Sequence, residues 1–264
     1  MQGDEQTLQK RAYSVPALER GLELIELLAS AADGLSQTDI AVRTGRTVSE
    51  NFRQLVCLEG AGYLRRGPDD RYRLSMKLFT LAHQLPPSRR VIDAALPEMH
   101  ALSQHARQSC HLGIEDGGDL LIIAQVESPA PVGINVRIGV RHPLATTASG
   151  RILLAQKDNA GRTAALLAAG TDPASGAGRL ALDRIEKIAQ FGFESVVDDT
   201  MFGIVDLSRP VFDRYGTCVA ALTIPFLTAS SRDNAIEAAL SDLAAAALRV
   251  SLALGHVPEK DLAQ

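Results

Sequence analysis

The residues most able to do chemistry in this chain are a set of arginines in its N-terminal third. Residues 43–90 hold ten Lys and Arg side chains against four Asp and Glu, a local charge of +6. The whole chain carries −4, so the remaining residues together carry −10. A cationic segment joined to an acidic body is typical of a surface that binds phosphates. Charge alone also allows a second interpretation, in which these arginines only cover a solvated face.

A second set of polar residues could in principle catalyse a reaction. Its members are Cys110, His111, His142, Asp198, Asp199 and Asp206. No nucleophile elbow, Walker loop, HExxH or dinucleotide glycine pattern accompanies them. Scattered His and Asp residues are more often structural than catalytic. We therefore expect no enzyme activity, no cofactor and no metal site.

Length and composition indicate a cytoplasmic protein. A chain of 264 residues is long enough for two compact domains. No stretch approaches the ~20 apolar residues that span a bilayer, and the polar N-terminus lacks the apolar core of a signal peptide. The three cysteines, Cys57, Cys110 and Cys218, are scattered and odd in number, which indicates reduced thiols. We expect no association with membranes.

The elements that position the arginines begin with three predicted helices. After Pro16, Leu18, Leu22, Ile25 and Leu28 recur at helical spacing, which predicts one buried face. Ser36 with Asp39, and Thr47 with Glu50, have the spacing of capping boxes that start two further helices. On the third helix, the apolar period is carried by Val48, Phe52, Leu55 and Leu58.

A basic hairpin follows the helices. Residues 63–66 and 71–74 have strand-type composition, and residues 67–70, Gly-Pro-Asp-Asp, have turn chemistry. Three helices and a basic hairpin, in this order, are typical of a winged helix-turn-helix that binds double-stranded DNA.

Five stretches of the chain resemble the IclR-type transcriptional regulators. They are residues 14–22, 34–41, 62–64, 139–150 and 203–223. The resemblance implies a mixed α+β protein, with an N-terminal winged helix-turn-helix and a C-terminal GAF-like α/β effector-binding domain. It also implies homodimers or tetramers, and effectors that are small organic acids or aromatics.

We expect a disordered tail at 1–13, a DNA-binding domain at 14–75, a linker helix at 76–88 and an effector-binding domain at 89–258. Strands are expected at 110–115, 120–125, 134–138, 194–197, 203–211 and 218–225. Helices are expected at 74–85, 91–107, 151–156, 160–169, 180–191 and 234–254.

The expected DNA-binding residues lie at the starts of the second and third helices and on the hairpin. They are Ser36, Gln37, Arg46, Thr47, Ser49, Glu50, Arg53, Gln54, Arg65, Arg66, Arg71 and Arg73. Arg53 could bind guanine or a phosphate, and Gln54 could read adenine. The hairpin arginines are expected on phosphates or in the minor groove.

The third helix departs from the family, whose members usually carry a Ser-Thr-Val-His-Arg-Leu-Leu run where this chain has residues 49–55. Glu50 could cap its own helix, accept a hydrogen bond from cytosine, or repel DNA. Asn51 and Gln54 place amides where apolar side chains usually pack. An oligomer that has lost DNA binding is therefore a rival hypothesis, and an enzyme built on the C-terminal domain is a second.

Carried over from the family, the effector positions are Ala148, Ser149, Asp199, Asp206 and Thr223. Free N–H groups at the start of a helix near Ala148 favour an anion. However, Asp206 and Pro225 stand where relatives often have Cys and Ser. A simple acid is then less suitable unless Arg209 or Arg137 compensates, and an amine, sugar-like or hydroxylated effector becomes plausible. A purely structural role for these positions is the alternative.

Overall fold

The computed structural model describes residues 14–83, 86–197, 202–228 and 235–258. The chain divides into two compact units, Met1–Leu85 and Pro86–Gln264. The expected disordered tail, residues 1–13, lies outside the described residues. Within the described part, every helix is too short or too polar to cross a membrane.

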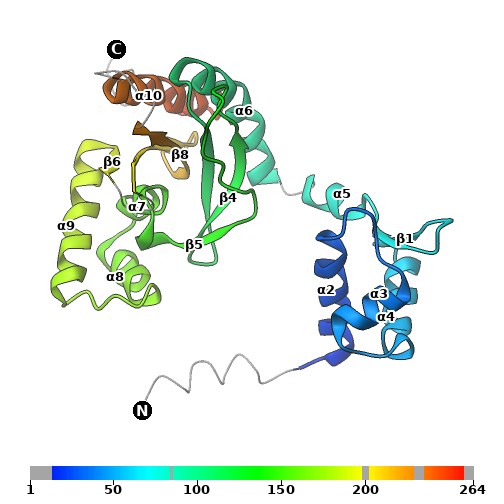
Figure 1. Cartoon of the computed structure of the whole chain (residues 1–264). Coiled ribbons are helices and arrows are strands. Elements are labelled where there is room, and N and C mark those ends of the chain that lie inside the picture. Colours follow the sequence, from blue (N-terminus) through cyan, green and yellow to red (C-terminus); the bar gives the residue numbers. More distant parts are fainter. Residues whose placement is uncertain (1–13, 84–85, 198–201, 229–234, 259–264) are drawn as a thin grey trace. The chain divides into compact units, whose positions relative to one another are not determined.

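The first unit consists of helices and a two-stranded hairpin (Figure 1). Its described elements are α2 (Pro16–Ala29), α3 (Gln37–Thr44), α4 (Val48–Gly60), β1 (Leu64–Arg66), β2 (Tyr72–Leu74) and α5 (Lys77–His83). β1 and β2 pair antiparallel, with Arg65 opposite Arg73. This order confirms the predicted winged helix-turn-helix.

Side-chain caps fix the starts of α3 and α4. The Ser36 hydroxyl accepts a hydrogen bond from the Asp39 backbone at 3.1 Å, and the Asp39 carboxylate accepts one from the Ser36 backbone at 3.0 Å. Thr47 and Glu50 form the same reciprocal pair at the start of α4. Gly45 ends α3 with a left-handed φ of 66°. Both predicted capping boxes are confirmed, and they determine where the two helices begin.

The core of the first unit comprises Leu24, Leu28, Leu35, Ile40, Leu55, Leu64 and Tyr72. The expectation that Leu18 and Leu22 are buried was wrong, because the inward face of α2 carries Gly21 with Leu24 and Leu28. Phe52 was also misplaced by the apolar pattern. Its side chain is 47% exposed, whereas Asn51 is buried beside Leu55.

The second unit is built on one six-stranded sheet with the order β5-β4-β3-β8-β7-β6, in which every neighbouring pair is antiparallel. The strands are β3 (Cys110–Asp116), β4 (Asp119–Val126), β5 (Arg141–Pro143), β6 (Glu194–Val197), β7 (Ile204–Phe212) and β8 (Cys218–Leu227). The helices are α6 (Pro86–Ala106), α7 (Ala148–Ala155), α8 (Asn159–Ala168), α9 (Gly176–Phe191) and α10 (Ala235–Ala253), with a 3-10 turn, η1 (Leu144–Thr146), before α7.

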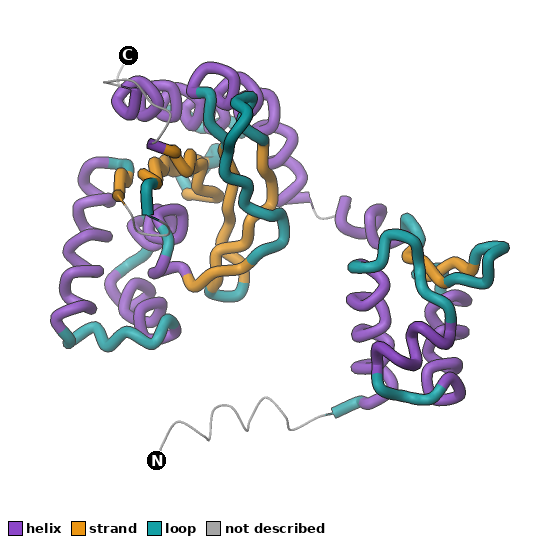
Figure 2. The backbone as a smooth tube through the Cα atoms, in the orientation of Figure 1, coloured by secondary structure: helices purple, strands orange, loops and turns teal. Residues whose placement is uncertain are grey.

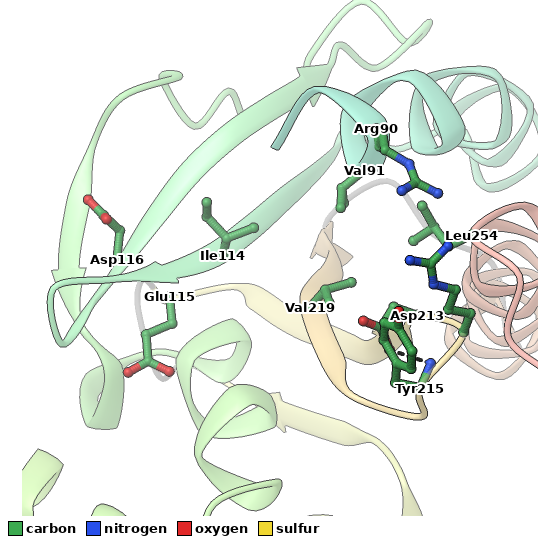
Figure 3. A pocket seen from close by; sticks show the side chains of 10 residues that line it. Arg90, Val91, Ile114, Glu115, Asp116, Asp213, Tyr215, Val219 and Leu254 are labelled. Atoms are coloured by element: carbon green, nitrogen blue, oxygen red, sulfur yellow. Dashed lines mark hydrogen bonds between the residues drawn. The ribbon is translucent and has the colours of Figure 1, made fainter. Parts of the chain in front are cut away.

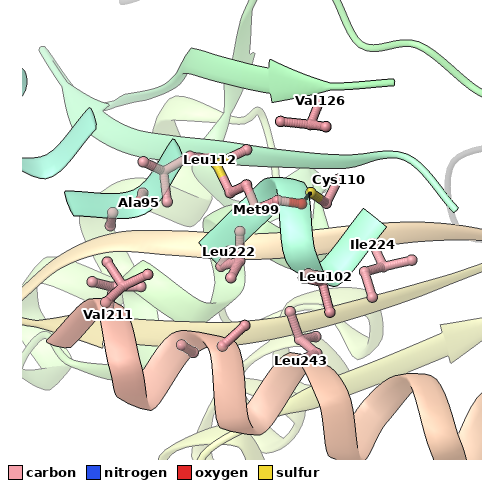
Figure 4. Close-up of a cluster of buried hydrophobic side chains, with 14 of the residues drawn as sticks. Ala95, Met99, Leu102, Cys110, Leu112, Val126, Val211, Leu222, Ile224 and Leu243 are labelled. Carbon is pink, nitrogen blue, oxygen red and sulfur yellow. Dashed lines mark hydrogen bonds between the residues drawn. The ribbon is translucent and has the colours of Figure 1, made fainter. Parts of the chain in front are cut away.

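Helices cover both faces of this sheet (Figure 2). α6 and α10 pack on one face, where Met99, Leu112, Leu222 and Leu243 belong to the main buried cluster (Figure 4). α7 packs on the other face through a second cluster that includes Ile152. Strand side chains reach both faces, and β4 and β8 contribute buried residues to both clusters. A mixed α+β fold was predicted and is confirmed.

Five expected elements differ from the structure. The helix expected over 180–191 begins four residues earlier, as α9 at Gly176, because Ser175 caps it. Residues 134–138 do not form a strand. Backbone hydrogen bonds to Ile122 of β4 are made from Gly139 and Val140 instead, and Gly139 turns the chain with a φ of 87°. α7 begins at Ala148 rather than Arg151, because Thr147 caps it. The long helix expected from Val91 begins at Pro86, since proline suits a first turn. The helix expected over 74–85 is the shorter α5.

Candidate functional site

The outer face of α4 is the first candidate site. Ser49, Phe52, Arg53 and Val56 are exposed there, at spacings of three and four residues that place them on one side of the helix. Arg53 makes no hydrogen bond or ion pair within the described residues. A guanidinium without an internal partner on an exposed helix face is available to a phosphate or a base edge.

Glu50 is occupied by its own helix. Its carboxylate accepts hydrogen bonds from the Thr47 backbone and from the Thr47 hydroxyl, both at 2.8 Å. These two bonds, the backbone one most of all, lower the pKa of Glu50. Of the three roles considered from the sequence, the structure places Glu50 in the capping role.

The two amides that depart from the family pattern face inward. Asn51 is 1% exposed and donates to the Thr44 hydroxyl at 3.0 Å, which ties α4 to the end of α3. Gln54 is half-buried, and its side-chain carbonyl oxygen is buried without a hydrogen-bond partner among the described residues. This orientation gives Gln54 no exposed carbonyl with which to read adenine.

Three of the four hairpin arginines already have partners within the unit. Arg73 donates to both carboxylate oxygens of Asp69, at 2.9 and 2.6 Å, and to the backbone carbonyl of Asp33 at 2.7 Å. Arg71 donates to the backbone carbonyl of Gly34 at 2.9 Å. These contacts fasten the hairpin to the turn before α3.

Arg66 lies 3.2 Å from the Asp70 carboxylate, and its guanidinium lies over the Tyr72 ring, 5.7 Å from the centroid. Arg65 is exposed and makes no hydrogen bond or ion pair with any residue that the structure describes. Arg65 is therefore the hairpin cation that remains available to a ligand.

The other expected DNA-binding residues lie around the α3–α4 turn. Arg46 forms an ion pair with Glu23 at 2.6 Å. Gln37 donates to the Tyr72 hydroxyl at 3.2 Å. Ser36 and Thr47 act as caps. All four have structural partners, which leaves Arg53 and Arg65 as the two expected arginines without a hydrogen bond or ion pair among the described residues.

The second candidate site is a chain of buried polar side chains at the start of α7. The Ser149 hydroxyl lies 2.7 Å from the Thr223 hydroxyl, which lies 2.7 Å from the Ser208 hydroxyl. The Nε2 atom of His111 lies 3.1 Å from the Ser149 hydroxyl. The strand register creates this chain, because His111 and Ser208 both lie opposite Thr223.

One atom of this chain has no partner. His111 is 7% exposed, and its Nδ1 makes no hydrogen bond among the described residues. Burial, and secondarily the charge of His142, lowers the pKa of His111 to about 4. The imidazole is therefore neutral at physiological pH, and Nδ1 can donate or accept one hydrogen bond depending on the tautomer.

The effector residues carried over from the family lie around this chain. Ala148 and Ser149 are the first two residues of α7, where backbone N–H groups have no acceptor within the helix. Asp206 is 7% exposed and lies two residues from Ser208 on β7, so both face the same side of the sheet. Asp199 lies outside the described residues.

Arg209, one of the two cations expected beside Asp206, faces away from it. Arg209 follows Ser208 on β7 and so points to the other face, where its guanidinium lies 4.8 Å from the centroid of the Phe193 ring. Arg137 is exposed. Arg151 of α7 is buried but is bound by Glu194 at 2.9 and 3.1 Å.

Sequence reasoning did not assign His111 and Ser208 to this site. The alternation of β3 and β7 and their register against β8 bring them to it, and a single sequence does not contain that register. Cys110 and His111, adjacent in the sequence, do not face each other, because neighbouring strand residues point to opposite faces. Cys110 instead donates to the Met99 carbonyl in the main core.

Both units match family models. Residues 17–68 match the IclR helix-turn-helix domain, and residues 84–252 match the bacterial transcriptional regulator IclR C-terminal domain. The HTH-type transcriptional regulator KdgR of Escherichia coli is 25% identical, over 94% of this chain and 96% of its own. The HTH-type transcriptional regulator XynR of Escherichia coli is 29% identical, over 92% of this chain and 98% of its own.

Solved structures share the fold. The crystal structure of an IclR homologue from Microbacterium hydrocarbonoxydans, complexed with 4-hydroxybenzoate, has a TM-score of 0.75 and 20% sequence identity. The alignment covers 90% of this chain and 98% of that one.

Proposed function

Because the chain belongs to the IclR family of DNA-binding transcriptional regulators, we propose that α4 reads the major groove of its operator through Ser49, Phe52, Arg53 and Val56. The observation that carries this proposal is Arg53, exposed and without a partner in the described part of the chain. Phe52 suits the methyl group of thymine, since apolar side chains make that contact.

This proposal makes the operator preference testable. Arg53→Ala should weaken binding about 5- to 150-fold, since a bidentate base contact contributes about 1–3 kcal/mol. Phe52→Ser should weaken binding at sites with thymine more than at sites with uracil, which lacks the methyl group. Equal loss on both DNAs would contradict the thymine contact.

The hairpin contributes a phosphate contact through Arg65. Arg65→Gln should lower the dependence of log affinity on log salt concentration by about 0.9, the value of one phosphate contact, without lowering the melting temperature. Arg73→Gln is the matched control on the opposite strand. It should lower the melting temperature, because Arg73 holds the hairpin to Asp69 and Asp33.

The rival hypothesis, a regulator-like oligomer without DNA binding, rested on Glu50, Asn51 and Gln54. Glu50 and Asn51 have structural partners in the α3–α4 turn, which favours retained DNA binding. We infer that the protein acts in the bacterial cytoplasm as a homodimer, in which two α4 helices bind the half-sites of a partly palindromic operator.

The buried polar chain at α7 supports an effector site formed by Ala148, Ser149, His111, Ser208 and Thr223. The start of α7 offers free N–H groups, and the unpartnered Nδ1 of buried His111 offers an unused hydrogen-bonding atom. Leaving a buried polar atom unpaired costs about 1–3 kcal/mol, which a bound ligand would recover.

The charges around this chain favour a neutral, hydroxylated effector over a simple carboxylate. His111 is neutral at physiological pH, and Arg209 and Arg151 are engaged elsewhere, so neither arginine is available to a carboxylate. The Microbacterium relative is complexed with an aromatic carboxylate. We propose that this chain takes a ligand whose hydroxyl groups exchange hydrogen bonds with Ser149 and His111.

Thermal shift measurements with matched sugars and sugar acids test this ligand class. Neutral sugars such as glucose and xylose should include stabilising ligands, while gluconate and xylonate should stabilise less. Ser149→Ala should remove the shift. Stabilisation by the acids alone would contradict the proposal.

Regulation then follows from linkage between the two units. An effector changes operator affinity only if it binds one arrangement of the dimer more tightly than another. A ligand with equal affinity for both arrangements would leave transcription unchanged. The stabilising ligand should therefore also change the affinity of the intact protein for its operator.

A further inference from the structure

A pocket of the C-terminal unit lies on the face of the sheet that α6 and α10 cover. Its cavity of about 500 Å³ is formed by the start of α6, the end of β3, the β7–β8 turn and the end of α10. That volume is within the range of sites for small organic ligands, about 300–1,000 Å³. Its apolar lining consists of Val91, Ile114, Val219 and Leu254 (Figure 3).

Two arginines without a carboxylate partner line this cavity. Arg90 makes no hydrogen bond or ion pair within the described ranges. The guanidinium of Arg214 lies 4.7 Å from the centroid of the Tyr215 ring, and it has no ion pair within those ranges either. Guanidinium groups bind carboxylates through paired hydrogen bonds, and Tyr215 adds an aromatic surface beside them.

Two of the three acidic residues of the pocket form ion pairs. Glu115 forms an ion pair with Lys157 at 2.8 Å, and Asp116 forms one with Arg141. Asp213 accepts hydrogen bonds from two backbone N–H groups of the β7–β8 turn, at 2.9 and 3.0 Å. Figure 3 shows Glu115 and Asp116 at the end of the pocket away from Tyr215. The guanidinium groups of Arg90 and Arg214 outnumber the single carboxylate of Asp213, so the net charge of the pocket is positive.

We propose that this pocket binds an amphipathic organic anion, an aromatic or branched aliphatic carboxylate. Its carboxylate would lie between Arg90 and Arg214, and its apolar body would lie on Val91 and Val219. The site is separate from the Ser149 chain, since the two lie on opposite faces of the sheet.

Isothermal titration of the full-length protein with benzoate tests the proposal, with benzamide as the uncharged match. Benzoate should bind saturably, and benzamide at least tenfold more weakly. The double variant Arg90→Gln/Arg214→Gln should bind benzoate at least tenfold more weakly than wild type. Arg137→Gln, which removes an exposed arginine outside the pocket, should bind like wild type.

Three outcomes would overturn the proposal. They are the absence of saturable benzoate binding to the wild type, equal binding by the double variant, and loss of binding in Ser149→Ala rather than in the arginine double variant. Circular dichroism of each variant identifies any loss that comes from unfolding. If the double variant misfolds, benzoate binding is measured with the single variant Arg90→Gln instead. This variant should bind benzoate more weakly than wild type, and equal binding would overturn the proposal.

Discussion

Lowering the pH from 7 to 5 should destabilise the C-terminal unit through His111. Burial lowers the pKa of this imidazole from 6.5 to about 4, so the folded unit takes up its proton less readily than the unfolded chain. The stability associated with neutral His111 is therefore fully present above about pH 6.5 and is lost progressively as the pH falls toward about 4.

The size of this effect follows from the two pKa values. At about 1.4 kcal/mol per pKa unit, the gap between 6.5 and about 4 corresponds to about 3 kcal/mol. About 2 kcal/mol of it is lost between pH 7 and pH 5, because the unfolded chain is largely protonated at pH 5 and the folded one is not.

The assay is urea unfolding of the full-length protein at pH 7 and pH 5, followed by circular dichroism. Other groups titrate in this range, so the comparison is with His111→Gln, which is neutral throughout. Wild type should lose about 2 kcal/mol more than the variant between the two pH values. Identical pH dependence in both proteins would refute the reasoning. A direct NMR titration should also find the imidazole neutral down to about pH 5.

Two further predictions concern packing and thiol chemistry in the same unit. Gly150→Ala should destabilise it by about 1–3 kcal/mol or more in thermal unfolding, because a Cβ there would lie 2.1 Å from the Leu144 carbonyl oxygen; an unchanged melting temperature would contradict that contact. A thiol reagent such as DTNB should label exposed Cys57 in the native protein and leave Cys110 and Cys218 unlabelled, since burial raises the pKa of both to about 12. Rapid labelling of three thiols would show that the core opens.

The sequence predicted the local features of the fold well. The Ser36 and Thr47 capping boxes and the hairpin after α4 depend on residues within a few positions of one another, so a single sequence contains them. The burial of Leu18 and Leu22 was predicted wrongly, because their apolar type does not say which face of α2 meets its neighbours. Phe52 was misplaced for the same reason.

The candidate sites depend on contacts between distant residues, and these were harder to predict. The sequence does not distinguish Arg73 from Arg53. In the structure, Arg73 donates a hydrogen bond to the Asp33 carbonyl, whereas Arg53 has no partner within the described residues. His111 and Thr223 are far apart in the chain and are joined by strand register. The likeness to the family named Ser149 and Thr223 as candidates, but not the imidazole that extends their hydrogen-bond chain.

Salt-dependent binding of the full-length protein to the intergenic DNA beside its own gene, comparing wild type with Arg53→Ala, tests the central claim most directly. We predict selective binding by the wild type and a loss of about 5- to 150-fold in the variant, with both proteins equally folded. The absence of selective binding at low salt, with and without a stabilising ligand, would contradict the account of α4 as the helix that reads the operator.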